Sequence, residues 1–185
     1  MEINYDTYYW KNDIVHLRPC TSEDWEEFYI NYFDSPARFF LDSLVELPLT
    51  EEEAKQQWKD FLEKSKQQGR INFMIESPAG EKVGCLNLNS IDERNGTFSI
   101  GMQIGREYRG KGYGTAAMKI LLQYAFYERR LHKFQGFVIE GNIASETMLK
   151  KLGCVQEGVI RGTTYHQGTY WNELHYGLFA EEFCK

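Results

Sequence analysis

A turn rich in glycine and positive charge, Arg109-Gly110-Lys111-Gly112-Tyr113-Gly114, carries the clearest chemistry in the sequence. It follows a strand-like stretch at residues 97–104 and precedes a helix-like stretch at 115–126. Glycine lets the backbone turn tightly and leaves amide N–H groups uncovered. Successive N–H groups in front of a helix, together with the positive end of the helix dipole, bind anions. The turn therefore predicts a phosphate-binding loop.

Three kinds of phosphate loop compete for this turn. Residues 105–112 come close to a P-loop, but the position after Lys111 is Gly112, where a P-loop needs serine or threonine to hold magnesium. Residues 112–117 fit a loose dinucleotide fingerprint, with Glu140 at the end of the next strand. In that fingerprint the strand runs directly into its first glycine, whereas several charged residues intervene here. A magnesium-dependent nucleotide enzyme and a dinucleotide enzyme are therefore both disfavoured.

The third kind fits best, because Arg109-x-x-Gly112-x-Gly114 resembles the acyl-CoA pyrophosphate loop of the GNAT superfamily of N-acyltransferases. That pattern is (Gln/Arg)-x-x-Gly-x-(Gly/Ala) between a strand and a helix. Further along, Asn142 and Ser145 resemble the family's Asn-x-x-Ser helix start, and residues 150–154 resemble its Lys-x-Gly helix end. The two motifs occur in the family's order and spacing.

The resemblance covers about residues 70 to 180. Within the family, the chain resembles the branch of ribosomal-protein N-terminal and spermidine acetyltransferases. The resemblance implies transfer of an acetyl group from acetyl-CoA to a primary amine by direct attack in a ternary complex. The acceptor amine would belong to a protein N terminus or to a small polyamine-like molecule. A non-catalytic module that binds and senses acyl-CoA is the alternative.

The resemblance also implies which residues act. The strand before the loop would bind the pantetheine arm mainly through its main chain, and the loop amides would bind the pyrophosphate. Ser145 stands where the ribosomal-protein branch has a serine and is the candidate proton donor, whereas the tyrosine of the spermidine branch falls on Leu149. The predicted cofactor-binding residues are Met102, Gln103, Ile104, Arg109, Gly110, Lys111, Gly112, Tyr113, Gly114, Thr115 and Asn142, and the predicted catalytic residues are Ser145, Asn142 and Glu173.

The general base has several candidates. Ser99 and Asn172 stand where relatives often carry Glu and Asp. Glu76, Glu140 and Glu173 all remain possible bases, as does a water relay without a dedicated base. Glu173 follows Asn172 directly and would face the opposite side of a regular strand.

Periodicity and turn residues predict the elements that position these groups. The sequence favours an α/β (α+β) fold with a mixed, mostly antiparallel sheet, a central splayed parallel strand pair and helices on both faces. Gly101 would mark a bulge or a close backbone approach. The expected strands are 14–19, 71–76, 82–89, 97–104, 133–140, 155–165 and 170–179, and the expected helices begin near 21, 50, 115 and 142, with a break at Ser35-Pro36.

The length of 185 residues suits a single acyl-CoA N-acyltransferase domain. Its parts would be acceptor-side helices at about 21–69, an acetyl-CoA-binding core at about 70–154 and a C-terminal strand pair at about 155–180. The long last strands are suited to pairing across a homodimer.

Composition restricts the partners and the location. A net charge of −6 argues against a general nucleic-acid binder, and no apolar run approaches the roughly 20 residues that cross a membrane. The N terminus lacks the pattern of a signal peptide. We expect a cytoplasmic protein without a metal site, with acetyl-CoA as acyl donor and a small-molecule or peptide amine as acceptor. The four dispersed cysteines should be reduced thiols: Cys20, Cys85, Cys154 and Cys184.

Overall fold

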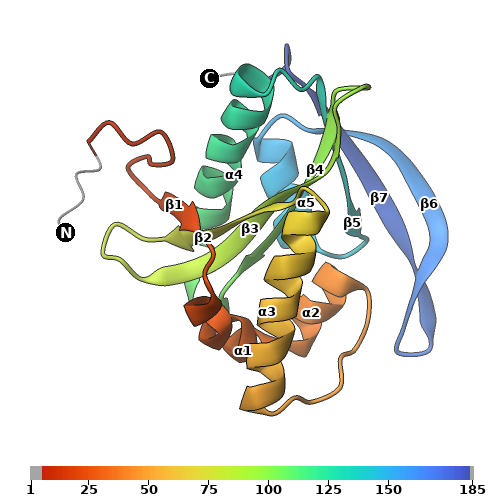
Figure 1. Cartoon of the computed structure of the whole chain (residues 1–185). Helices are drawn as coiled ribbons and strands as arrows, with labels where there is room; N and C mark the ends of the chain where they lie inside the picture. The colour runs from red at the N-terminus through yellow and green to blue at the C-terminus, as the bar shows by residue number, and fades with distance from the viewer. Residues whose placement is uncertain (1–5, 184–185) are drawn as a thin grey trace.

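A seven-stranded sheet in the order β1-β2-β3-β4-β5-β7-β6 forms the centre of the computed structural model, which describes residues 6–183 (Figure 1). Its strands are β1 (His16–Pro19), β2 (Ile71–Glu76), β3 (Lys82–Asp92), β4 (Thr97–Ile104), β5 (Lys133–Ile139), β6 (Val155–His166) and β7 (Thr169–Phe179). The helices are α1 (Trp25–Tyr32), α2 (Ser35–Asp42), α3 (Glu51–Gln67), α4 (Tyr113–Gln123) and α5 (Ile143–Lys151). Single turns of 3-10 helix lie at Ser22–Asp24 and Arg106–Tyr108, and a π-helical turn at Tyr124–Glu128 extends α4.

All neighbouring strands are antiparallel except β4 and β5, which run parallel. A strand–helix–strand crossover through α4 joins that pair, and such a crossover returns the chain in the same direction. The predicted mixed sheet with a central parallel pair is therefore confirmed.

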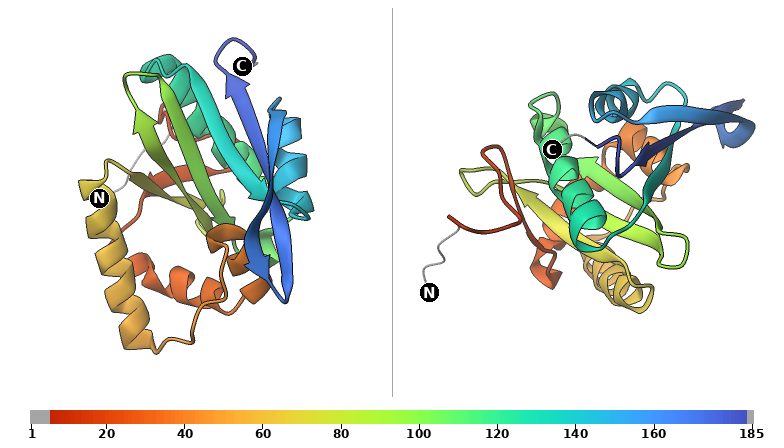
Figure 2. Two further views of the ribbon diagram at one scale, coloured as in Figure 1. Left: turned by 90° about the vertical axis from the view of Figure 1, so that its right-hand side faces the viewer. Right: turned by 90° about the horizontal axis from the view of Figure 1, so that it is seen from above.

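Helices cover both faces of the sheet, as Figure 2 shows with α3 on one side and α5 on the other. The apolar stripe of α4 fills the core on the α5 side, where Ala117 and Leu121 are fully buried. On the opposite side α1 packs against α3, with Phe28 and Trp58 stacked at 5.5 Å between ring centroids. The face that carries α1, α2 and α3 is called the acceptor face below.

Three expectations need correction. Helix α1 ends before the Ser35-Pro36 pair, as predicted, but this pair also begins α2, a helix that was not expected, because proline is tolerated in the first turn of a helix. Asp34 caps that helix by accepting a hydrogen bond from the Ala37 amide. Strand β3 continues to Asp92, three residues beyond the predicted end, by means of a register shift. Helix α4 begins two residues earlier than predicted.

Gly101 marks a close approach, as predicted, and the side chain that approaches is Asn87 on β3. A Cβ atom at Gly101 would lie 3.1 Å from Asn87 Nδ2. The two residues are paired in the β3–β4 register, so the contact follows from the sheet itself.

The sheet ends at β6, most of which is exposed. Two register shifts interrupt its pairing with β7, and such irregularities protect an edge strand against pairing with other chains. Pairing of this edge across a homodimer stays a prediction. Cys20, Cys85 and Cys154 are free thiols, and Cys184 lies outside the described residues.

Phe98 is the last residue of β4 that pairs with β5, and its ring is fully buried against Phe126 and Phe134. We expect Phe98→Ala to lower the free energy of unfolding by about 3–5 kcal/mol, since a cavity would open under the parallel pair. Chemical denaturation measures this. Phe33→Ala is the control, because that ring is 71% exposed and its loss should cost no more than about 0.5 kcal/mol. Equal costs would contradict the prediction.

Candidate active site

A gap in the middle of the sheet is the central feature of the site. Strands β4 and β5 pair at only two positions, Thr97 with Lys133 and Phe98 with Phe134. Beyond them the strands separate, and the Ser99 hydroxyl donates to the Gln135 carbonyl at 2.5 Å where the separation begins. The rest of β4 therefore offers alternate backbone amides and carbonyls to an extended ligand instead of to β5. The predicted splayed pair is confirmed.

The glycine-rich loop closes one end of this gap, and its glycines have different roles. Gly110 and Gly112 have φ of 75° and 87°, a left-handed conformation that glycine adopts without strain. At Gly114 the reason is space, because a Cβ atom there would lie 3.2 Å from Met102 Cε. The first helical hydrogen bond runs from the Ala116 amide to the Gly112 carbonyl, at 3.0 Å. The amides of residues 113–115 therefore face outward, within the described chain, without a backbone acceptor.

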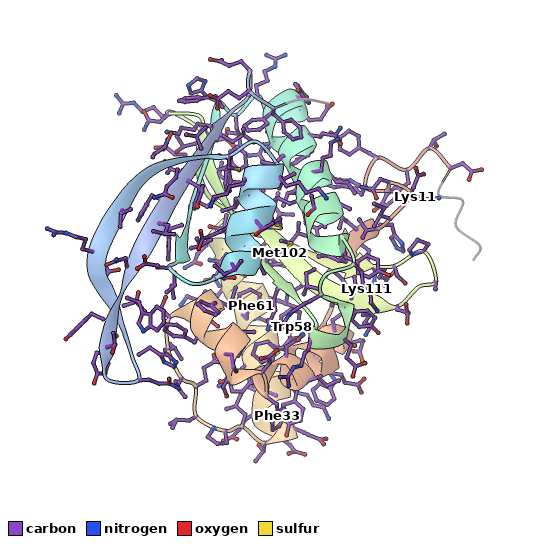
Figure 3. All side chains as sticks on the ribbon, turned by 180° about the vertical axis from the view of Figure 1, so that it is seen from behind. Lys11, Phe33, Trp58, Phe61, Met102 and Lys111 are labelled. Atoms are coloured by element: carbon purple, nitrogen blue, oxygen red, sulfur yellow. The ribbon has the colours of Figure 1, made fainter. Side chains whose placement is uncertain are left out.

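The two basic side chains of the loop are placed differently. Arg109 donates from Nε to the Ile104 carbonyl at 2.9 Å and pairs through Nη1 with Asp34 at 2.8 Å. Its guanidinium therefore ties the loop to the end of β4 and to the cap of α2. Lys111 Nζ lies 5.4 Å from the centroid of the Tyr108 ring, and the exposed lysine precedes the first residue of α4 (Figure 3). Lys111 is thus the more accessible charge for an anion at this loop.

The side chains at the end of β4 are already occupied. Met102 and Ile104 pack toward Gly114 of α4. Gln103 points to the acceptor face, where its Oε1 accepts a hydrogen bond from Arg38 Nη1 at 3.3 Å. With all three side chains directed above or below the sheet, only their main chain faces the gap.

Asn142 and Ser145 lie together at the start of α5, at the end of β5. Asn142 caps the helix, because its Oδ1 accepts the Ser145 amide at 3.2 Å. The half-buried Ser145 hydroxyl has no hydrogen-bond partner among residues 6–183. Leu149 is buried in the core, and Cys154 is also buried, which raises its pKa to about 12 and keeps the thiol protonated at neutral pH. Within the described residues, the Ser145 hydroxyl and the Asn142 Nδ2 group are thus both left with polar hydrogens free.

The candidate bases lie in separate places. Glu76 is held by His16 and Arg18 on β1, at 2.8 and 2.5 Å, two strands away from β4. Glu140 accepts a hydrogen bond from Asn172 Nδ2 at 2.8 Å. The third candidate, Glu173, lies on β7.

Glu173 points away from the core that includes Leu174, and therefore toward the acceptor face. Its Oε2 lies 3.3 Å from His175 Nε2, and it is paired in register with Ile139 near the end of β5. Like Glu76, Glu173 lies two strands away from β4, but on the β5 side of the gap.

Aromatic side chains that the sequence analysis missed close the acceptor face. The imidazole of His166, at the tip of the β6–β7 hairpin, stacks on Phe39 of α2 with 3.8 Å between ring centroids. Trp171 meets Phe39 edge to face at 6.1 Å and covers Gly141, where a Cβ atom would lie 3.3 Å from its ring. No local pattern predicted the contacts with Phe39, because they join segments more than 100 residues apart.

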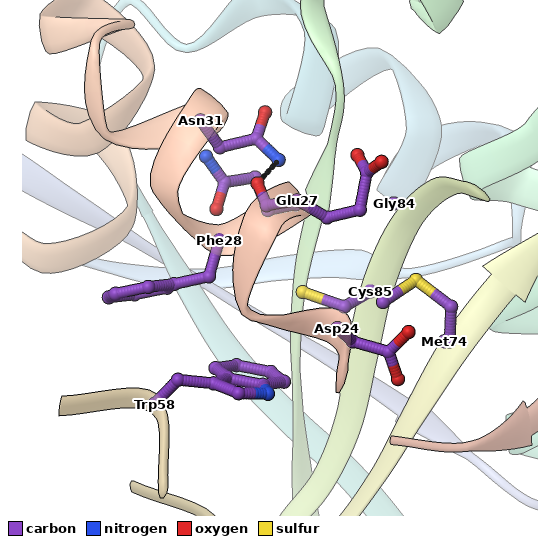
Figure 4. A pocket seen from close by; sticks show the side chains of 9 residues that line it. Asp24, Glu27, Phe28, Asn31, Trp58, Met74, Gly84 and Cys85 are labelled. Atoms are coloured by element: carbon purple, nitrogen blue, oxygen red, sulfur yellow. Dashed lines mark hydrogen bonds between the residues drawn. The ribbon is translucent and has the colours of Figure 1, made fainter. Parts of the chain in front are cut away.

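A small cavity under α1 is shown in Figure 4. It is lined by Glu27, Phe28, Trp58, Cys85 and Gln103 among others, and its volume is about 20 Å³. That volume holds about one water molecule, so the cavity is too small for a substrate. Burial raises the pKa of Glu27 above its ordinary value.

Two features of the described residues bear on metal binding and on membrane insertion. No group of three or more His, Cys, Asp or Glu side chains within residues 6–183 could hold a metal ion. In the same part of the chain, no helix has the length and apolar character needed to cross a membrane.

Comparisons with known proteins agree with this geometry. A family model for the acetyltransferase (GNAT) domain matches residues 15–155. The SPbeta prophage-derived uncharacterized N-acetyltransferase YokL of Bacillus subtilis (strain 168) is 26% identical over 175 residues, 95% of each chain. The spermidine N(1)-acetyltransferase of Escherichia coli (strain K12) is 28% identical over 173 residues, 91% of this chain and 88% of that protein.

A solved structure shares the fold at lower identity. It is the spermidine N-acetyltransferase of Vibrio cholerae in complex with CoA and spermine. The two chains superpose with a TM-score of 0.81 at 17% identity, over 92% of this chain and 98% of the other.

The pairing of Arg109 with Asp34 can be tested by a double-mutant cycle. We expect Arg109→Met to lower the free energy of unfolding by about 1–3 kcal/mol, because it leaves a buried carboxylate without its cation. Asp34→Asn should cost about 1 kcal/mol, and the double variant should cost less than the sum by about 0.5 kcal/mol or more. Chemical denaturation gives these values, with Lys111→Met as a control of similar size and charge. Additive effects would contradict the pairing.

Proposed function

Since the chain belongs to the GNAT acetyltransferase family and is therefore an acyltransferase, we propose that it transfers an acetyl group from acetyl-CoA to a primary amine. The single observation that carries this proposal is the gap between β4 and β5 that leads to the glycine-rich loop. An extended arm with amides fits an open strand edge, and a pyrophosphate fits the free amides in front of α4.

The cofactor would therefore lie along β4. The amides of residues 109–115 would bind the pyrophosphate, with Lys111 adding charge. The main chain of Met102, Gln103 and Ile104 would bind the pantetheine arm. The acetyl group would then lie further back along β4, near the point where Ser99 joins the two strands.

The reaction would proceed in a ternary complex. The neutral amine attacks the thioester carbon, a C–N bond forms, and the C–S bond breaks. A free lysine-type amine has a pKa of about 10.4, so a base is useful, and we assign this role to Glu173. The departing thiolate needs a proton, which the Ser145 hydroxyl would supply beside Asn142.

Two acceptor classes remain open at this point, a small polyamine-like amine and a protein N-terminal α-amine. The names of the Escherichia coli and Vibrio cholerae relatives support a small amine acceptor. The cytoplasmic location expected from the sequence stays a prediction.

Calorimetric titration with acetyl-CoA tests the loop. We expect wild type to bind and Gly112→Glu to lose at least about tenfold in affinity, because the new carboxylate repels the pyrophosphate. Gly80→Glu is the matched control, since Gly80 in the β2–β3 turn also has a left-handed φ, 81°, and open space around it. Equal losses in both variants, or no binding by wild type, would refute the cofactor site. Binding without turnover of any amine would indicate the non-catalytic acyl-CoA-binding module instead.

Ser145→Ala tests the proposed proton donor. We expect kcat to fall by about 10²-fold while the Kd for acetyl-CoA stays within about twofold, since the hydroxyl acts on the leaving thiolate. Thiol release in the presence of an amine measures kcat. Thr147→Ala removes an exposed hydroxyl from the same helix and should leave kcat unchanged. An unchanged kcat in Ser145→Ala would leave this residue with no role in catalysis.

A further inference from the structure

A short chain of hydrogen bonds on β3 ends at an unpaired amide beside the proposed reaction site. The Ser90 hydroxyl donates to Asn89 Oδ1 at 2.8 Å, and Asn89 Nδ2 donates to Asn87 Oδ1 at 2.6 Å. The chain leaves Asn87 Nδ2 with two N–H donors and with no acceptor among residues 6–183. Asn87 is half-buried, so this donor is reachable from solvent but held in place.

The position of this amide connects it to the gap. Asn87 is paired with Gly101, and a Cβ atom there would meet both amide atoms, Nδ2 at 3.1 Å and Oδ1 at 3.3 Å. Glycine thus allows the amide to lie against β4. Gly101 is two residues past Ser99, within the part of β4 that has left β5. The Asn87 amide therefore lies against β4 at Gly101, with only this strand between β3 and the gap.

The start of the hydrogen-bond chain is a strained residue. Ser90 has φ of 50°, which a residue with a side chain rarely adopts, and it lies at the register shift between Asn89 and Asp92. Strain of this kind is often kept where it serves a site. Here it accompanies the hydroxyl contact that fixes the orientation of the Asn89 amide, and through it that of Asn87.

The carboxylates of α2 and of the loop after it all lie in ion pairs. Residues 33–50, which contain α2 and the loop after it, hold three acidic side chains. Asp42 and Glu46 both pair with the buried guanidinium of Arg38, the latter at 2.6 and 2.7 Å, and Asp34 pairs with Arg109. The three carboxylates share two guanidinium groups, so one negative charge is left over, but each carboxylate already has an arginine partner. A polyamine would have to compete with these arginines for its further ammonium groups.

We propose that the acceptor is an amine with a carbonyl oxygen close to it, as at a peptide N terminus, and that Asn87 binds this oxygen. The inference rests on the proposed function and narrows its acceptor. A donor N–H suits a carbonyl oxygen, whereas every nitrogen of a protonated polyamine is itself a donor. The α-amine of a peptide is one carbon away from its first carbonyl carbon, so one fixed amide can orient it for attack.

Steady-state kinetics with two acceptors tests the proposal. The acceptors are a short peptide amide that starts with alanine and lacks lysine, and spermidine. We expect wild type to favour the peptide at least about tenfold in kcat/KM. Asn87→Leu should lower the peptide value about tenfold, mainly through KM, because one hydrogen bond is lost. Asn87→Asp should lower it further and raise the spermidine value, so that the ratio of the two changes at least about 10²-fold.

Controls distinguish a direct role of the Asn87 side chain from a general loss of structure. Asn72→Asp places the same charge on the same face, one strand further from the gap, and should leave the ratio unchanged. Calorimetry with acetyl-CoA should give the same Kd for all variants and so confirms folding. If Asn87→Leu does not fold, Ser90→Ala can replace it, since it removes the first hydrogen bond of the series at an exposed position. It should lower the peptide kcat/KM about threefold.

The outcomes distinguish the two proposals. Preference of wild type for spermidine, or an unchanged ratio in Asn87→Asp, would overturn the peptide acceptor while leaving acetyl transfer in place. Acetyl-CoA binding without acetylation of either acceptor would also overturn the peptide acceptor, whereas binding without turnover of any primary amine would refute the proposed function itself.

Discussion

The separation of β4 from β5 is the constraint on which the rest of the structure depends. Two strands in the middle of a sheet give up most of their mutual hydrogen bonds, and buried backbone groups without partners are costly. The fold limits that cost by pairing β4 fully with β3 and β5 fully with β7. The pairs at Thr97 and Phe98 then act as a closed end, sealed by aromatic packing. The unpaired groups that remain define the site where an extended ligand can bind.

The two halves of the divided sheet are joined again through α2. Arg109 connects the loop after β4 to the cap of that helix, and Arg38 connects its first half to Gln103. On the far side Phe39 stacks on His166, at the tip of the hairpin that continues from β5 through β7. One eight-residue helix and its cap thus contact β4, the glycine-rich loop and the β6–β7 hairpin. Its geometry sets the width of the acceptor face, which is why its charges matter for the acceptor.

Local signals in the sequence were enough to predict the glycine-rich turn before α4 and most strands. The left-handed Gly112, the cap formed by Asn142 and the strand before the loop each depend on neighbours in sequence. The strand pairs that diverge were predicted from the family resemblance and confirmed by the register. Helix α2 was missed because proline reads as a break unless the capping Asp34 is recognised before it.

The acceptor side could not be predicted because its contacts are distant in sequence. The role proposed for Asn87 depends on its register with Gly101. The contacts of Arg38 depend on the fold bringing Glu46 and Gln103 to it. The candidate base illustrates the same limit. Glu76 and Glu173 look alike in sequence, but the fold pairs the first with His16 and Arg18 of β1 and places the second on β7, across β5 from the gap and next to His175.

The polar groups around the gap also bear on the choice between transfer and mere binding of acyl-CoA. A binding module needs only the open strand edge and the loop. This chain in addition keeps a half-buried Ser145 hydroxyl on one side and a half-buried Asn87 amide on the other, both without partners within residues 6–183. Half-buried donors of this kind can exchange water for a ligand, and Ser90 adds backbone strain beside one of them. That strain is better explained by a group that gains a partner when an acceptor occupies the site.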